Sequence, residues 1–279
     1  MTLPFAAPAP ALPAPDDPWL WREPFRVRAY EIGPDERATV LTLCDYFQEA
    51  AGEHARAAGV ETFALPSGGV GVWVLRRLGL RLVRRPAWRE HVRVETWPSH
   101  YEGLLAHRDF VVRAAAGAPD GRDAPGDVLA FGTSAWFVID AARRRPVRLP
   151  EGVGAFGPPT GAPRALVLSA EPEPPSDDAD ARERRFHVRR SDLDRNAHAN
   201  NVRFAEWALE AVPDAVQAAH TLASLDVSFR AEAVSGDTVL SRAARLPAAP
   251  AGDLAYTHAL LRERDGRMLA LARSTWHSS

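Results

Sequence analysis

The same order of secondary-structure signals occurs twice along this chain of 279 residues, and this repetition constrains the fold more than any other feature. In each half a short strand signal leads into one helical pattern, and several strand signals follow. The helical patterns cover about residues 38–58 and the segment from Asn201 to Pro213. In the first half the expected strands are 25–32, 70–75, 78–83, 92–97, 107–113 and 128–139. In the second half they are 185–188, 224–231, 238–243, 255–262 and 268–276.

The last expected strands of the two halves also share sequence. Residues 129–136 and 269–276 both carry Leu, Ala, Ser and Trp at equivalent positions, which favours an internal duplication. Consecutive strands joined by short turns imply antiparallel pairing, because parallel pairs need long crossovers. One helix for each sheet implies that the sheet curls round it. We therefore predict an α+β fold, a tandem double hotdog in which each unit is an antiparallel sheet wrapped round one long central helix.

A change of composition separates the two halves. Residues 149–181 are rich in Gly and Pro and then in acidic residues and Pro, which is typical of an exposed linker. We therefore expect an Ala/Pro-rich disordered tail over 1–18, an N-terminal hotdog over 19–148, and a C-terminal hotdog over 182–279.

Bulk properties exclude several classes of protein. The net charge of −2 does not suit a nucleic-acid binder, and no stretch approaches the roughly 20 apolar residues of a membrane span. The start of the chain lacks a basic segment followed by a long apolar one, so we expect a cytoplasmic protein. The single cysteine, Cys44, excludes an internal disulfide framework and lies in a helical pattern, where it reads as a core residue.

Residues 191–201 form the most polar segment, with two carboxylates, three amides and an imidazole just before a helix. Free backbone N–H groups at a helix start favour negative charge, so this loop could stabilise an oxyanion beside a water and a base. Simpler interpretations remain open, because Asn200 or Asn201 could cap the helix and Asp192 could close an Asx turn. A calcium loop would need Gly at Ala197 and Glu at Arg203, and a zinc site would need ligands near His198 in the sequence.

This segment resembles the motif Ser-Asp-Leu-Asp-x-Asn-Gln-His-Val-Asn-Asn of the acyl-ACP thioesterases, which are double-hotdog enzymes of plants and bacteria. Residues 30–35, 86–88 and 92–97 are also similar to segments of that family, and the resemblance extends over about residues 22–276. It implies hydrolysis of a fatty acyl-ACP thioester to a free fatty acid and holo-ACP, as part of fatty acid biosynthesis.

The resemblance also implies site residues. The family's catalytic aspartate, asparagine and histidine fall on Asp194, Asn196 and His198, and its distant glutamate falls on Glu232. Glu232 lies in the segment 229–237, which matches the family less closely because one residue is inserted before Gly236. Without the resemblance, Glu232 would read as a solvated acid at a strand end. Glu232 and His198 would activate a water, and Asn196 with backbone N–H groups would bind the carbonyl oxygen. Asp194 would orient His198 or Asn196, or would itself attack the thioester.

By analogy with the family, the acyl chain would lie in the N-terminal unit. Apolar residues there that could line its slot, or could equally be ordinary core, are Leu43, Phe47, Trp73 and Phe137. No metal or cofactor is implied. The expected partner is an acyl carrier protein, whose acidic surface could meet the arginine-rich runs 76–89 and 184–190, and a homodimer is possible.

Three rival hypotheses stay open. An acyl-CoA thioesterase would share the fold and the reaction. A hotdog hydratase or dehydratase would carry a His-x-x-x-Phe-Pro signature, which this sequence lacks, and a non-catalytic acyl-thioester binder would retain the ligand without turnover. A serine hydrolase is disfavoured because no Gly-x-Ser-x-Gly elbow is present.

Overall fold

The computed structural model describes residues 17, 19–115, 126–149, 162–176, 181–247 and 253–278. Most of the expected tail over 1–18, and residues 150–161 and 177–180 of the expected linker, lie outside this part. The chain divides into two compact units. The N-terminal unit contains the described residues up to Arg76 together with Leu80–Val167, and the C-terminal unit contains Arg77–Gly79 and the described residues from Leu168 onward.

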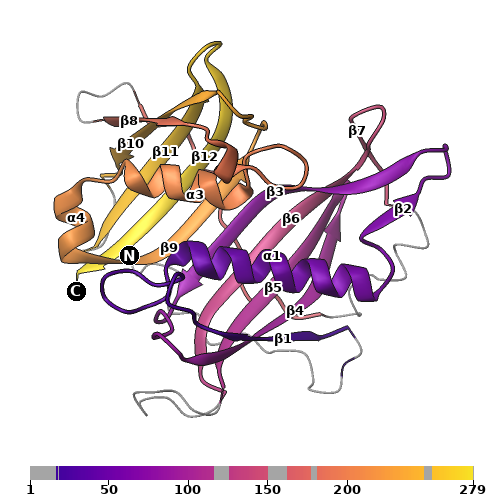
Figure 1. Cartoon of the computed structure of the whole chain (residues 1–279), viewed down its shortest axis with the longest axis horizontal. Coiled ribbons are helices and arrows are strands. Elements are labelled where there is room, and N and C mark those ends of the chain that lie inside the picture. The colour runs from indigo at the N-terminus through magenta and orange to yellow at the C-terminus, as the bar shows by residue number, and fades with distance from the viewer. Residues whose placement is uncertain are drawn as a thin grey trace. The chain divides into compact units, whose positions relative to one another are not determined.

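The N-terminal unit consists of one long helix and an antiparallel sheet (Figure 1). The helix is α1 (Val40–Ala57). The strands are β1 (Trp21–Arg26), β2 (Thr62–Ala64), β3 (Val70–Leu82), β4 (His91–Glu102), β5 (Leu105–Ala114), β6 (Val128–Asp140) and β7 (Arg145–Val147). Their order is β1-β4-β5-β6-β3, with β2 paired to β3 and β7 paired to β6.

Helix α1 forms because its sequence supplies both a cap and an apolar face. The Thr39 side chain accepts a hydrogen bond from the Thr42 N–H at 3.2 Å, which satisfies one of the free donors of the first turn. The buried face includes Leu43 and Phe47, and the Phe47 ring stacks on Phe110 of β5 with 4.6 Å between ring centroids. The helix therefore buries its apolar face against its own sheet.

The C-terminal unit repeats this plan. It contains β8 (Arg182–His187), the 3₁₀ turn η2 (Arg190–Asp192), α3 (Asn201–Glu210), α4 (Asp214–Ala219), β9 (His220–Phe229), β10 (Thr238–Arg245), β11 (Leu254–Arg262) and β12 (Arg267–Ser278). The strand order is β9-β12-β11-β10-β8, and α3 packs on β10, β11 and β12. Phe204 and Trp207 of α3 are buried against this sheet, and small residues such as Ala270 and Ala272 let the helix approach closely. The predicted α+β double-hotdog architecture is confirmed.

Several predicted boundaries were wrong. The first strand ends at Arg26 rather than residue 32, because Glu31 closes a turn by accepting the N–H of Arg28 at 2.7 Å. The two strands expected over 70–83 are one continuous strand, β3. Its central Arg77 forms an ion pair with Asp226 at 2.6 Å, so a polar residue is accommodated in mid-strand. The short elements β2, β7 and α4 were not predicted.

Part of the expected linker is docked rather than exposed. In the N-terminal unit the Ala165 N–H donates to the buried Asp109 carboxylate at 2.7 Å, and Ala165 is 5% exposed. In the C-terminal unit, Leu168 packs against Gly79, whose missing side chain leaves room for it. The Gly-, Pro- and acid-rich composition did not predict this packing, because single apolar residues such as Ala165 and Leu168 are enough to hold the segment against the protein.

Among the helices that the structure describes, none is both long and apolar enough to cross a bilayer. Cys44 is completely buried in α1, and burial raises the pKa of its thiol to about 12, which agrees with its interpretation as a core residue.

Candidate active site

The polar loop before α3 is a tight, hydrogen-bonded turn. Leu193 and Ala199 form an antiparallel bridge, and the Asp194 N–H donates to the His198 carbonyl oxygen at 2.7 Å. Ala197 adopts a left-handed conformation with φ of 59° to close this turn. The loop therefore presents Asp194, Asn196 and His198 from one short, closed segment.

The Asp194 carboxylate holds the interior of this turn. Its Oδ1 accepts the Asn196 N–H at 2.8 Å and the His198 N–H at 3.3 Å. Its Oδ2 lies 3.5 Å from the Asn196 side-chain nitrogen. These contacts are typical of an Asx turn, and they orient Asn196 and the backbone of His198 rather than the imidazole.

Glu232 reaches this loop through a short stretch of β pairing. His198 forms a bridge with Val234, and the Ala199 N–H donates to the Ala233 carbonyl oxygen at 2.8 Å. As a result, the Glu232 Oε2 lies 3.5 Å from the His198 Nδ1. The two side chains are 41% and 32% exposed, so water reaches both of them. The structure thus brings together all four residues that the family motif indicates.

The helix-cap interpretation holds for Asn200, whereas Asp192 does not close an Asx turn, because its carboxylate accepts the N–H of Arg189, three residues before it. Asn200 is the N-cap of α3, and its Oδ1 accepts the Val202 N–H at 3.0 Å. Asp192 is 2% exposed, accepts the Arg189 N–H at 2.8 Å and forms an ion pair with the Arg189 guanidinium at 2.8 Å. Since the Val202 N–H is occupied by the cap, this donor at the helix start is not available to a ligand in this state.

Asp237 is a residue near the site that sequence reasoning did not single out. Its side chain is 1% exposed, its Oδ2 accepts the Val234 N–H at 3.1 Å, and its Oδ1 lies 3.2 Å from Arg264. The available signal was its position at the end of the segment 229–237, but nothing in the sequence indicates that a hydrophilic residue there is buried.

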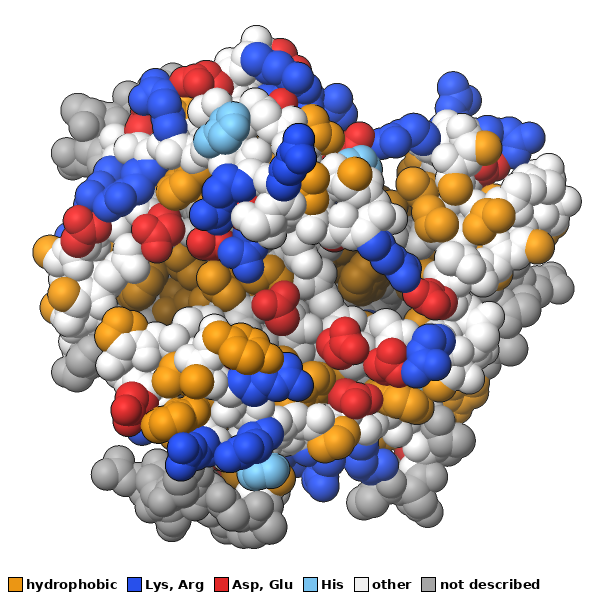
Figure 2. Space-filling view, in the orientation of Figure 1, with side chains coloured by type: hydrophobic (Ala, Val, Ile, Leu, Met, Phe, Trp, Pro, Cys, Tyr) orange, Lys and Arg blue, Asp and Glu red, His pale blue; other side chains and the backbone are white. Residues whose placement is uncertain are grey.

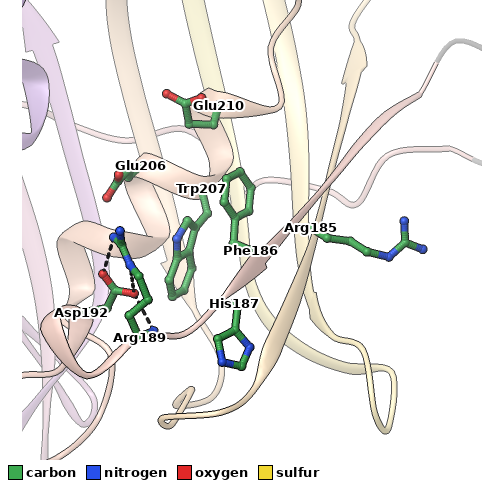
Figure 3. A pocket seen from close by; sticks show the side chains of 8 residues that line it. All are labelled: Arg185, Phe186, His187, Arg189, Asp192, Glu206, Trp207 and Glu210. Atoms are coloured by element: carbon green, nitrogen blue, oxygen red, sulfur yellow. Dashed lines mark hydrogen bonds and ion pairs between the residues drawn. The ribbon is translucent and has the colours of Figure 1, made fainter.

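A pocket of about 530 Å³ lies beside the loop, between β8 and α3 of the same unit (Figure 3). Trp207 and Phe186 form its aromatic wall, with 6.3 Å between the ring centroids. The remaining lining residues are Arg185, His187, Arg189, Asp192, Glu206 and Glu210. The pocket borders the loop through Asp192 and is lined by residues other than the four brought together above.

The four expected acyl-pocket residues occupy different settings in the N-terminal unit. Leu43 and Phe47 are fully buried on α1, and the Phe47 ring lies against Gly132 of β6. Trp73 of β3 is half-buried and donates its Nε1–H to the Val60 carbonyl oxygen at 2.8 Å. Phe137 lies five positions along β6 from Gly132, so the alternation of side chains places it on the sheet face opposite to α1. Leu43 and Phe47 therefore lie on the side of the sheet that α1 covers, whereas Phe137 lies on the opposite side of the sheet.

The arginine runs are largely paired with acids. Among the described residues, Arg84 pairs with Glu90, Arg85 with Asp35, Arg184 with Asp214, Arg185 with Glu263 and Arg189 with Asp192. Figure 2 shows basic and acidic side chains interspersed over the face that it displays. Among the residues that the structure describes, no group of three or more His, Cys, Asp or Glu side chains is arranged to hold a metal ion.

Comparison with known proteins gives consistent results. The model of the acyl-ACP thioesterase N-terminal domain matches residues 18–156, and that of the acyl-ACP thioesterase C-terminal domain matches residues 175–278. The dodecanoyl-[acyl-carrier-protein] hydrolase of Cinnamomum camphora is 27% identical, over 92% of this chain and 67% of that protein. The palmitoyl-acyl carrier protein thioesterase of Arabidopsis thaliana is 30% identical, over 94% of this chain and 65% of that protein.

The solved structures agree in fold. The 12:0-ACP thioesterase from Umbellularia californica superposes with a TM-score of 0.78 at 25% identity, covering 94% of this chain and 95% of that one. The chain spans about two thirds of the length of the curated relatives that it matches. Together, the two family models and the geometry of the loop show that this chain belongs to the acyl-ACP thioesterase family.

Proposed function

We propose that this protein hydrolyses fatty acyl-ACP thioesters to a free fatty acid and holo-ACP. The observation that carries the proposal is the 3.5 Å approach of Glu232 to His198, on the loop that also presents Asp194 and Asn196. A carboxylate beside an imidazole that water can reach is an arrangement that supports general-base activation of water. Membership of the family supports the choice of substrate.

In the proposed reaction, Glu232 accepts the Nδ1–H of His198, and this leaves the Nε2 lone pair free to act as the base. His198 removes a proton from a water molecule, and the resulting hydroxide attacks the thioester carbonyl carbon. The Asn196 side-chain amide donates to the developing oxyanion. The tetrahedral intermediate then collapses, the C–S bond breaks, and the proton held by His198 passes to the departing thiolate.

Asp194 has a supporting role in this scheme. Both of its oxygens already contact N–H groups of the loop, which favours the orientation of Asn196 over direct attack on the thioester. A carboxylate that is engaged in this way is a weaker nucleophile, because attack would break the hydrogen bonds that close the turn.

The partner in this proposal is an acyl carrier protein that bears a fatty acyl phosphopantetheine. We further propose that the acyl chain lies in the N-terminal unit along the α1 face that carries Leu43 and Phe47. Trp73 remains a candidate for this slot, whereas Phe137 lies on the sheet face opposite to α1 and would not line it. A homodimer and a cytoplasmic location also remain predictions.

The test is release of free acid from a panel of acyl-ACPs with four to eighteen carbons, beside the same acyl-CoAs. We expect hydrolysis of acyl-ACPs, with a large fall in kcat in both Glu232→Gln and His198→Ala. Preferential hydrolysis of acyl-CoAs would establish the other carrier. Retention of acyl-ACP without turnover by the folded wild-type protein would overturn the proposal.

A further inference from the structure

The internal duplication extends to the hydrogen bonds that shape the active-site loop. Residues 31–39 of the N-terminal unit adopt the same turn as residues 192–200. The Thr39 N–H donates to the Glu31 carbonyl oxygen at 3.0 Å, as the Asn200 N–H donates to that of Asp192 at 2.8 Å. The residues in the left-handed conformation also correspond, with φ of 56° at Glu36 and 59° at Ala197.

Each loop pairs in the same way with a second segment of its own unit. In the N-terminal unit, Arg37 bridges Ala87, and the Ala38 N–H donates to the Pro86 carbonyl oxygen at 2.8 Å. The pairing of residues 198 and 199 with residues 233 and 234 is its counterpart. By this correspondence, the N-terminal equivalents of the four site residues Asp194, Asn196, His198 and Glu232 are Gly33, Asp35, Arg37 and Arg85.

The N-terminal loop therefore keeps the backbone of the site without its chemistry. In place of the imidazole and the glutamate it carries two arginines, and Arg85 forms an ion pair with Asp35. The backbone hydrogen bonds that the two loops share are therefore those that form the turn, whereas the side chains that differ between them are those proposed to carry out the reaction.

One shared feature is a buried carboxylate, Glu90 or Asp237, that accepts a backbone N–H of the second segment, and we call this contact the clamp. Glu90 is completely buried; its Oε2 accepts the Ala87 N–H at 2.8 Å, and its Oε1 pairs with Arg84 at 2.8 Å. Asp237 is its counterpart, with its Oδ2 accepting the Val234 N–H at 3.1 Å. In both units the carbonyl oxygen of the clamp residue also accepts an N–H from the end of the first strand segment at 2.9 Å.

The clamp at Asp237 acts on the residues that bring Glu232 to His198. Val234, whose N–H Asp237 holds, is the residue that bridges His198, and Glu232 lies two positions before it. Two guanidinium groups stabilise the Asp237 carboxylate, that of Arg264 at 3.2 Å and that of Arg262 at 3.7 Å. Loss of this charge would loosen the turn 232–237 and widen the distance between the carboxylate and the imidazole.

We propose that Asp237, supported by Arg264, is a positioning residue that sets the distance between Glu232 and His198. This inference rests on the proposed thioesterase function for its kinetic consequence, but its structural consequence can be measured without it. Asp237 touches no substrate in this scheme and acts only through Glu232.

The kinetic test uses Asp237→Asn, with Glu90→Gln as the matched control in the other unit. Both changes remove one buried charge from the same kind of clamp. We expect Asp237→Asn to lower kcat about 100-fold with little change in KM, since displacement of a catalytic group by about 1 Å costs on that order. Glu90→Gln should leave kcat within about twofold of wild type. Equal loss of kcat in both variants would refute a positioning role specific to the site.

A double variant distinguishes positioning from a general structural effect. If Asp237 acts through Glu232, Asp237→Asn should lower kcat no further in a protein that already carries Glu232→Gln. Full additivity of the two losses would overturn the inference. If Asp237→Asn does not fold, Arg264→Gln removes one arm of the clamp at an exposed side chain and should lower kcat in the same direction by a smaller factor.

Hydrogen exchange keeps this inference separate from the proposed activity. The Ala199 N–H bonds to Ala233 and therefore reports whether the two segments stay paired. We expect its exchange to accelerate at least tenfold in Asp237→Asn and to be unchanged in Glu90→Gln, in which the Ala38 N–H should accelerate instead. Unchanged exchange at Ala199 would overturn the inference even if the protein proved inactive. Accelerated exchange in a protein without thioesterase activity would sustain the clamp and refute only the proposed function.

Discussion

Acidification should destabilise the C-terminal unit through one buried histidine, His258 of β11. This residue is completely buried beneath α3, and its Nε2 lies 2.9 Å from the Ser274 hydroxyl oxygen. The same hydroxyl accepts the Trp276 Nε1–H at 2.9 Å. Burial lowers the pKa of the His258 imidazole from 6.5 to about 4, because the charged form would lose its hydration.

The direction in which the free energy of unfolding changes with pH follows from proton binding. Below pH 6.5 the unfolded chain binds a proton at this histidine, whereas the folded chain does so only near pH 4. The stabilisation is therefore complete above the unfolded pKa and is lost as the pH falls toward the folded value. Between pH 8 and pH 5 the free energy of unfolding should fall by about 2 kcal/mol from His258 alone. His54 of α1 should add a similar loss, since burial and the nearby Arg108 lower its pKa to about 3.

The assay is urea denaturation at several pH values between 8 and 5, for the wild type, His258→Gln and the exposed control His187→Gln. His258→Gln should reduce the pH-dependent loss by about 2 kcal/mol, whatever its stability at pH 8, because glutamine does not titrate. His187→Gln should retain the wild-type dependence. If the free energy of unfolding of His258→Gln fell between pH 8 and pH 5 as much as that of the wild type, the assignment of this fall to His258 would be refuted.

Three further outcomes are expected. Asn196→Ala should lower kcat by about 10²–10³ with the fold intact by circular dichroism, and an unchanged rate would remove Asn196 from the oxyanion site. Gly132→Ala should lower the free energy of unfolding by about 1–3 kcal/mol in a thermal melt, because its Cβ would lie 2.4 Å from the Phe47 ring. A rise in melting temperature would show that the ring yields at no cost. Ala197→Gly should stabilise the protein by up to about 1 kcal/mol by relieving its φ of 59°, and a loss of stability in the same melt would contradict that strain.

The double-hotdog architecture could be predicted because the evidence for it is local and repeated. The buried positions of α1 recur at helical spacing from Val40 to His54, and Thr39 supplies the cap. The strands alternate with short turns, which leaves antiparallel pairing as the available arrangement. Boundaries were less predictable where a side chain overrides the local pattern, as when Glu31 ends the first strand early and Arg77 pairs with Asp226 within β3.

By itself the sequence determined the fold class, the loop that carries Asp194, Asn196 and His198, and the resemblance that indicated Glu232, since each depends on residues that are close in the chain or on a shared motif. Tertiary structure alone decided that Glu232 lies 3.5 Å from His198, that Asp237 is buried and holds the Val234 N–H, and that Phe137 faces away from α1. The physical reason is that these relations depend on strand register and on the burial of charge. Both are settled by long-range pairing and desolvation, which the local order of residues does not specify.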